Sequence, residues 1–200
     1  MRRTMLKAAL PLLLITAMLA APSCIFDPKE DPIIPTPDPI VWPDMTSRDD
    51  VIKTVVLTYG NRKIGESTAK YNALLHSQYF FGLAPGDVDP GDPPILTRAQ
   101  DIASTEWLFS DETTVLDLEI TPEVGSWYEY FELDGEPCEN CYGTERQYFI
   151  RAQFGDETTT FQSTPGRAFV VVIVAPDETD ASKWVMRAMY DNGNGNLGRE

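Results

Sequence analysis

The chain has 200 residues and a formal net charge of -15, from 31 acidic and 16 basic side chains. Its apolar content of 42% suffices for a buried core, which excludes a wholly disordered chain and a disulfide-scaffold peptide. The acidic excess leaves no electrostatic footprint for a phosphate backbone, so we expect no nucleic-acid partner.

The first 23 residues have the layout of an export signal. Three basic residues precede an apolar run at 8–21, which has the length of a signal-peptide core and is too short to cross a bilayer. The run ends in LAAPSC, which resembles the lipobox of bacterial lipoproteins. The resemblance implies a lipid on Cys24, a membrane anchor, and a place in the bacterial cell envelope facing the periplasm or the exterior. The alternative is an ordinary cleavage site after Ala21 or Ser23.

Residues 24–45 are expected to form a proline-rich linker. Six prolines fall between Asp27 and Pro43, which favours an extended, semi-rigid tether for the domain that follows. A proline-rich tail without a tethering role is the alternative. Removal of residues 1–23 takes three basic residues away and leaves 13 against 31 acidic ones, a net charge of -18.

Cysteine usage fits an exported protein once Cys24 is assigned to the lipid. Cys138 and Cys141 remain as a pair, within residues 135–143, whose Gly and Pro predict a turn. We expect a disulfide between them, with free thiols as the alternative. A zinc site would need a second ligand pair, and a thioredoxin-type site would need a following helix instead of the strands predicted on both sides.

Two acidic stretches faintly resemble calcium loops. They are Asp87–Asp92 and Asp191–Asn196, and neither has the closing bidentate Glu of an EF-hand. The sequence also contains no P-loop, no dinucleotide-binding glycine turn and no nucleophile elbow. We therefore expect no metal and no cofactor.

Helices are predicted early in the globular part. Ser47 and Asp50 form a capping-box-like start before apolar residues at helical spacing, and Thr97–Gln100 forms a second capping box. Gly and Pro break up residues 82–94, so we expect irregular structure there. The predicted helices cover 47–60, 67–76 and 97–109, with a short strand at 79–81 after the second.

Strands dominate the rest of the chain. Residues 116–120 alternate apolar and acidic side chains, which is typical of a strand with one solvated face. Residues 168–174 are apolar throughout, which predicts a central strand buried on both faces. Further strands are predicted at 127–133, 146–154 and 183–190. Helices followed by antiparallel strands indicate an α+β domain.

This order of elements resembles the nuclear transport factor two-like, or SnoaL-like, cone fold. The resemblance is carried by residues 74–81, 166–171 and 184–191, and it covers about residues 46–191. It implies three N-terminal helices packed on a strongly curved antiparallel sheet, with a pocket between the helices and the sheet. Residues 192–200 are expected to be a flexible C-terminal tail.

Candidate site residues follow from the implied pocket. His76 is the weak catalytic candidate because its ordinary pKa lies near neutrality, and a helix-capping role is the alternative. Six aromatic residues are candidates for lining the pocket, with a place in the core as the alternative. They are Tyr59, Tyr71, Trp107, Trp127, Tyr148 and Trp184.

Three functions are compatible with these residues. The first is a non-catalytic, lipid-anchored domain that binds a small apolar ligand or a protein partner. The second is a lyase or isomerase of the SnoaL or ketosteroid isomerase type, using His76 or a buried carboxylate. The third is a structural module that forms a homodimer through its sheet. A shared fold does not choose among them.

Overall fold

The computed structural model describes residues 39–86, 88, 91, 93–121, 126–155, 159–163 and 168–191. The described residues from Val41 onward belong to one compact unit. The expected signal peptide, Cys24, most of the linker and the tail at 192–200 lie outside the described residues, as does most of each acidic stretch. No helix among the described residues is long and apolar enough to cross a membrane.

Two of the helices in the described chain begin at the capping boxes that the sequence predicts. Ser47 Oγ accepts from the backbone N–H of Asp50 at 3.3 Å, and Asp50 Oδ2 accepts from the backbone N–H of Ser47 at 3.1 Å. Thr97 and Gln100 form the same reciprocal pair ahead of the third helix. The helices are α2 (Arg48–Gly60), α3 (Gly65–Leu74) and α4 (Arg98–Phe109).

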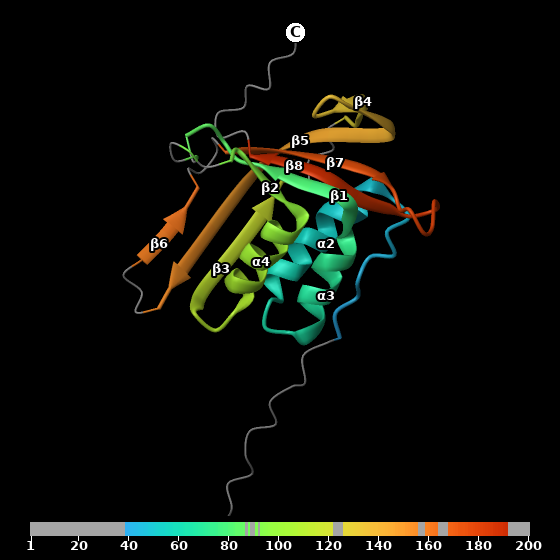
Figure 1. The fold of residues 1–200 in the computed structure, drawn as a ribbon. Helices are drawn as coiled ribbons and strands as arrows, with labels where there is room; N and C mark the ends of the chain where they lie inside the picture. The colour runs from blue at the N-terminus through green and yellow to red at the C-terminus, as the bar shows by residue number, and fades with distance from the viewer. Residues whose placement is uncertain are drawn as a thin grey trace, which may run out of the picture. The chain divides into compact units, whose positions relative to one another are not determined.

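The strands form one strongly curved sheet in the order β2-β1-β8-β7-β5-β3, and the helices lie on one side of it (Figure 1). β4 and β6 also pair with β5. The strands are β1 (Leu75–Gly82), β2 (Ile95–Thr97), β3 (Thr113–Ile120), β4 (Tyr128–Leu133), β5 (Glu136–Phe154), β6 (Thr159–Gln162), β7 (Phe169–Pro176) and β8 (Trp184–Asp191).

The α+β class expected from the sequence is confirmed, but the expectation of an antiparallel sheet is wrong. β1 pairs with β8 in parallel, with Phe80 opposite Ala188, so the sheet is mixed. Hairpins force their two strands to be antiparallel, whereas β1 and β8 come from opposite ends of the domain and no hairpin joins them. Sequence pattern carries no signal for such a long-range pairing.

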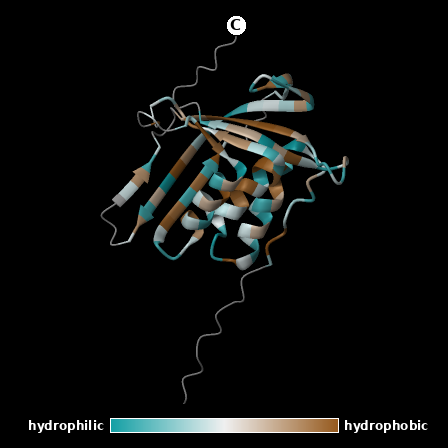
Figure 2. Ribbon diagram, in the orientation of Figure 1, coloured by the Kyte–Doolittle hydropathy of each residue, from teal (hydrophilic) through white to brown (hydrophobic). Residues whose placement is uncertain are grey.

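The central strand β7 is buried on both faces, as its apolar run predicted. Val170, Val172 and Val174 belong to the main core, together with residues of the helices. Val171 and Ile173 face the other side, where they pack in a second, smaller core with Leu133 and the two cysteines of β5. Hydrophobic residues are concentrated along β7 and β8 in Figure 2.

The hairpin before β5 differs from the sequence prediction. Its turn is Asp134–Gly135, with φ of 51° and 80°, and Leu133 pairs with Glu136 across it. Asp-Gly is the sequence that two-residue hairpin turns favour, since both residues need positive φ. Cys138 and Cys141 therefore lie within β5, at a register shift opposite β4, where the structure has a disulfide between them.

Candidate functional site

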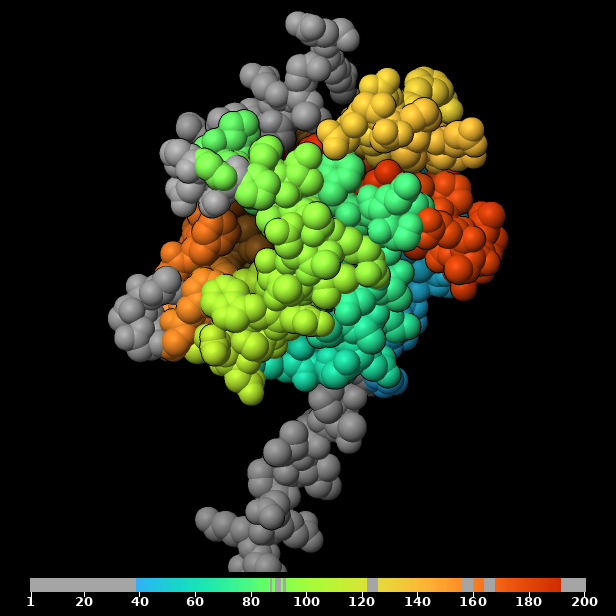
Figure 3. Space-filling view, viewed as in Figure 1, coloured from blue at the N-terminus to red at the C-terminus, as the bar shows by residue number. Residues whose placement is uncertain are grey.

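A cavity of about 480 Å³ lies between the helices and the inner face of the sheet. Side chains from α2, α3, α4 and seven of the strands line it, and most of the lining is apolar or aromatic. Figure 3 shows the surface hollowed between the orange strands β5 and β6 and the yellow-green helix α4. The core formed by the described residues therefore leaves space inside the cone.

A buried carboxylate lies in this cavity. Asp101 of α4 is 7% exposed, and it accepts a hydrogen bond of 2.8 Å from the hydroxyl of Tyr71 in α3. Tyr59 and Phe109 pack edge-on around Tyr71, with ring centroids 6.1 and 6.3 Å from its own. The carboxylate thus sits in an aromatic setting with one hydrogen bond from a neutral donor.

Two local features hold Asp101 in place. Asp101, Thr105 and Phe109 are spaced four residues apart, so they share the buried stripe of α4. Arg98, one turn earlier, donates to the carbonyl oxygens of Asn72 at 2.8 Å and of Leu75 at 3.4 Å. These bonds tie the start of α4 to the end of α3, the helix that carries Tyr71.

The titration of these groups reflects their burial. Desolvation raises the pKa of Asp101 to about 6, although the hydrogen bond from Tyr71 opposes the rise. Desolvation and the nearby Asp101 charge raise the pKa of Tyr59 to about 12. Burial also raises the pKa of Tyr71 and of Tyr79. Near neutral pH the tyrosines are neutral, and Asp101 changes charge within the physiological range.

A second carboxylate lies at the end of β8. Asp191 lines the same cavity and accepts a hydrogen bond of 2.8 Å from the hydroxyl of Tyr148 in β5. Asp191 is half-buried, whereas Asp101 is buried. The cavity therefore has two tyrosine–aspartate pairs on mostly apolar walls.

Only part of the aromatic set proposed from the sequence lines this cavity. Tyr59, Tyr71 and Tyr148 do so. Trp107 is 48% exposed and stacks on Phe154 outside the lining. The other two tryptophans have different partners. Trp127 donates to Asp49 at 3.3 Å, and Trp184 packs edge-on against Tyr142.

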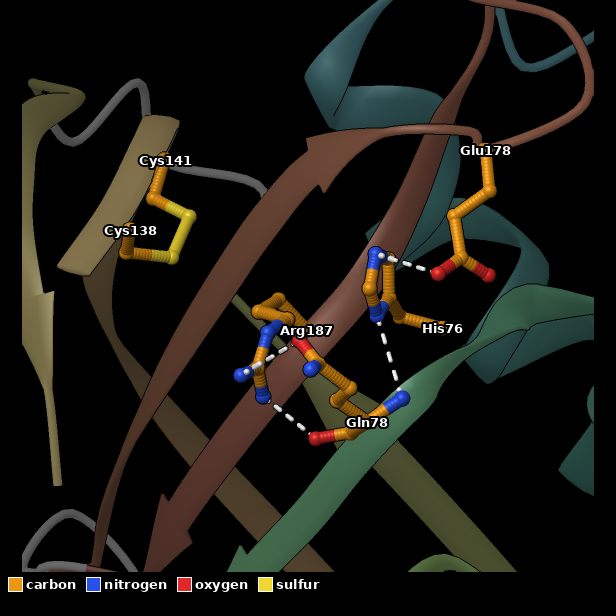
Figure 4. Close-up of a disulfide and its surroundings, with 6 residues drawn as sticks. All are labelled: His76, Gln78, Cys138, Cys141, Glu178 and Arg187. Atoms are coloured by element: carbon orange, nitrogen blue, oxygen red, sulfur yellow. Dashed lines mark hydrogen bonds and ion pairs between the residues drawn. A yellow bond between two sulfur atoms is a disulfide. The ribbon is translucent and has the colours of Figure 1, made fainter. Parts of the chain in front are cut away.

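His76 lies in β1, not at the end of a helix, and it is not among the residues that line the cavity. Its Nδ1 accepts from the backbone N–H of Gln78 at 3.1 Å, and its Nε2 lies 3.5 Å from Glu178 Oε1. Arg187 donates to the carbonyl and side-chain oxygens of Gln78 beside it (Figure 4). Burial, aided by the Arg187 charge, lowers the pKa of His76, while Glu178 opposes this.

Sequence reasoning left the buried carboxylate unassigned. Asp101 follows a capping box directly, where acidic residues are common for their interaction with the helix dipole. A usable signal was present, because Asp101, Thr105 and Phe109 repeat at helical spacing. Its partner could not be found from the sequence, since Tyr71 lies 30 residues away on another helix.

Among the described residues, no group of three or more His, Cys, Asp or Glu side chains could hold a metal ion. The two carboxylates of the cavity are accompanied there by hydroxyl and apolar groups. The arrangement suits hydrogen bonding and proton exchange with an enclosed molecule.

No protein-family profile matches the sequence, and no curated protein is similar to it in sequence. Solved structures do share its fold. A Novosphingobium aromaticivorans protein named as an aromatic ring hydroxylase is 9% identical, with a TM-score of 0.52 over 72% of this chain and 84% of that one. The Kfla4162 protein of Kribbella flavida is 10% identical, with a TM-score of 0.50 over 74% of this chain and 90% of that one.

A nuclear transport factor 2 (NTF2-like) superfamily protein from Salmonella enterica serovar Typhimurium was also matched. It is 10% identical, with a TM-score of 0.48 over 77% of this chain and 99% of that one. At such identities the likeness concerns the fold.

Proposed function

We propose that this chain, which has the NTF2-like (SnoaL-like) cone fold, binds a small and largely apolar molecule in the cavity of the cone. The observation that carries the proposal is the cavity of about 480 Å³, whose size and apolar walls are typical of small-molecule sites. The pairs at Asp101 and Asp191 supply the few polar contacts that orient a ligand in such sites.

The test blocks the cavity from the exposed side of α4. Ser104 lines the cavity, and Ala103 beside it does not, although both are exposed. We expect naphthalene-based and other apolar probes to raise the melting temperature of the full chain and of Ala103→Trp, but not of Ser104→Trp. Absence of a shift with every probe, or an equal shift in both variants, would contradict ligand binding in this cavity.

A lyase or isomerase activity is the second candidate, and Asp101 favours it. The Asp101 carboxyl group has a pKa of about 6 and accepts a hydrogen bond from a tyrosine in a largely apolar site. Such a group is suited to accept or donate a proton near neutral pH. His76 gives this candidate no support, because it lies outside the cavity lining.

This activity is tested with a β,γ-unsaturated cyclic ketone, whose isomerisation to the conjugated ketone is followed by ultraviolet absorption. If Asp101 is the base, the rate rises with pH through about 6, since the ionised carboxylate is the active form. We expect Asp101→Asn to abolish the reaction and His76→Gln to retain it. A rate that is unchanged in Asp101→Asn excludes Asp101 as the base.

We also propose that the chain is exported and anchored in a bacterial envelope through a lipid on Cys24. The support is the basic segment and apolar run of residues 1–21, the lipobox-like sequence and the proline-rich linker after it. In a bacterial host, the full chain should lose residues 1–23 and partition into detergent, whereas the Cys24→Ser variant should keep those residues and carry no acyl group. The intact mass of a modified chain should show the added acyl groups. A wild-type chain found in the aqueous phase would contradict the anchor.

A further inference from the structure

The charged side chains that line the cavity are of one sign. Among the described residues, Asp101 and Asp191 line it, and no Lys, Arg or His does. The whole chain is acidic as well, with a net charge of -15. An anionic ligand would therefore meet repulsion both inside the cavity and during its approach.

Asp101 has no counter-ion within the described part of the chain. Its hydrogen bond comes from Tyr71, a neutral donor, and no cationic group contributes to its raised pKa. A buried carboxylate without a paired cation carries an uncompensated desolvation cost. An ammonium group on a ligand would offset this cost, whereas a neutral group would offset less of it.

The walls around the carboxylates also suit a cation. Tyr59, Tyr148, Phe81 and Phe161 line the cavity, and aromatic ring faces attract ammonium groups in apolar surroundings. Aliphatic side chains of the same cavity, such as Leu96 and Leu118, would contact an apolar body. The lining therefore combines negative charge, aromatic rings and apolar surface.

We propose that the cavity selects an organic cation, a molecule with an apolar body and a protonated amine that contacts the carboxylates of Asp101 and Asp191. The inference rests on the proposed ligand-binding function and adds to it the charge class of the ligand.

The proposal fixes the pH dependence of binding. The titratable side chains facing Asp101 are Tyr59 from α2, Tyr71 from α3 and Tyr79 from β1, and all three stay neutral because burial raises their pKa. A cation binds the ionised form of Asp101, so its affinity falls by about tenfold from pH 7.5 to pH 5. A ligand that accepted a hydrogen bond from protonated Asp101 would show the opposite trend.

The experiment compares three naphthalene compounds of matched shape by calorimetric titration of the full chain. They are 2-naphthylethylamine, 2-naphthylethanol and 2-naphthylacetate, which are cationic, neutral and anionic at pH 7.5. We expect the amine to bind at least about tenfold tighter than the alcohol, as one desolvated charge pair would provide, and the acetate to bind weakest.

Charge-neutralising variants test whether the two aspartates cause the tighter binding of the amine. Asp101→Asn and Asp191→Asn should each weaken amine binding by about tenfold and leave alcohol binding within about twofold. Glu106→Gln is the matched control, because Glu106 is an exposed acidic residue of α4 that does not line the cavity. It removes the same charge and should leave amine binding unchanged.

Each outcome is decisive. A preference for the amine that is lost in both Asp variants and weakened at pH 5 supports the proposal. If the alcohol or the acetate binds as tightly as the amine, the cation preference is overturned. The proposed ligand-binding function is not contradicted by that result. If Glu106→Gln loses as much affinity for the amine as the two Asp variants do, the preference comes from the overall charge of the chain, and the proposed site is overturned. Binding of none of the three compounds contradicts this inference and the proposed function together.

Discussion

Asp101 shows how one side chain connects the fold to its chemistry. Its carboxylate is buried among aromatic rings, where the Tyr71 hydroxyl partly offsets the loss of water. Desolvation therefore outweighs the hydrogen bond, and the pKa rises to about 6. The charged form of Asp101 thus costs stability, a pattern typical of functional sites.

This cost predicts a pH-dependent stability difference. Between pH 3.8 and about 6, Asp101 binds more protons in the folded chain than in the unfolded chain. The contribution of Asp101 to the free energy of unfolding therefore falls as pH rises through this range, and it is constant at higher pH. The drop is about 3 kcal/mol, at about 1.4 kcal/mol per pKa unit. Asp101→Asn does not titrate there, so its free energy of unfolding relative to wild type should increase by about 2 kcal/mol from pH 4 to pH 7, because part of the drop lies below pH 4.

Urea unfolding at the two pH values measures this difference. Comparing the variant with the wild type cancels the titration of the surface carboxylates, several of which have a lowered pKa because they accept hydrogen bonds. Glu106→Gln serves as the reference, because Glu106 is an exposed acidic residue of the same helix. A difference between Asp101→Asn and the wild type that stays constant with pH would show that Asp101 is not destabilised by burial.

At the scale of elements, the β4–β5 hairpin forms a second core on the outer side of the sheet. Leu133 and the two cysteines pack there against Val171 and Ile173 of β7. Gly143 of β5 makes this packing close, because a Cβ at that position would lie 2.4 Å from the ring of Tyr130. The disulfide lies inside this core, since Cys138 is 7% and Cys141 1% exposed.

Loss of the disulfide should therefore loosen this hairpin. The bond closes a short loop, with a sequence separation of 3, so the entropic contribution to stability is about 2 kcal/mol. We expect Cys138→Ala/Cys141→Ala to lose about that amount and to show faster amide exchange in β4, with α2–α4 remaining protected. A reducing agent should reproduce the effect in the wild type and leave the double variant unchanged. Unaltered exchange in β4 would contradict this role.

At the scale of the whole molecule, the homodimer expected from the sequence stays a prediction. β4 pairs only with β5 among the described strands, and its Phe131 is 74% exposed. An edge strand with an exposed aromatic residue favours pairing with a second copy. We expect sedimentation equilibrium of the full chain to show a dimer that Phe131→Lys weakens. Val41→Lys, at a residue 86% exposed outside the sheet, should not weaken it. A monomer at all concentrations would contradict the dimer.

The sequence by itself determined the local features of this protein. The two capping boxes set the starts of α2 and α4, because a cap depends on residues three positions apart. The continuous apolar run at 168–174 determined that β7 is central, since only a strand covered on both faces buries every side chain. Alternation likewise located β3, whose acidic residues lie between apolar ones.

Only the tertiary structure decided the site and the pairing of the strands at the two ends of the domain's sequence. Tyr71 meets Asp101 across 30 residues, Tyr148 meets Asp191 across 43, and β1 lies parallel to β8 from the other end of the domain. Such contacts arise from how helices and strands pack, and local propensity does not encode them. His76 and three tryptophans were plausible by residue type, but packing turned them away from the cavity lining and brought two aspartates into it.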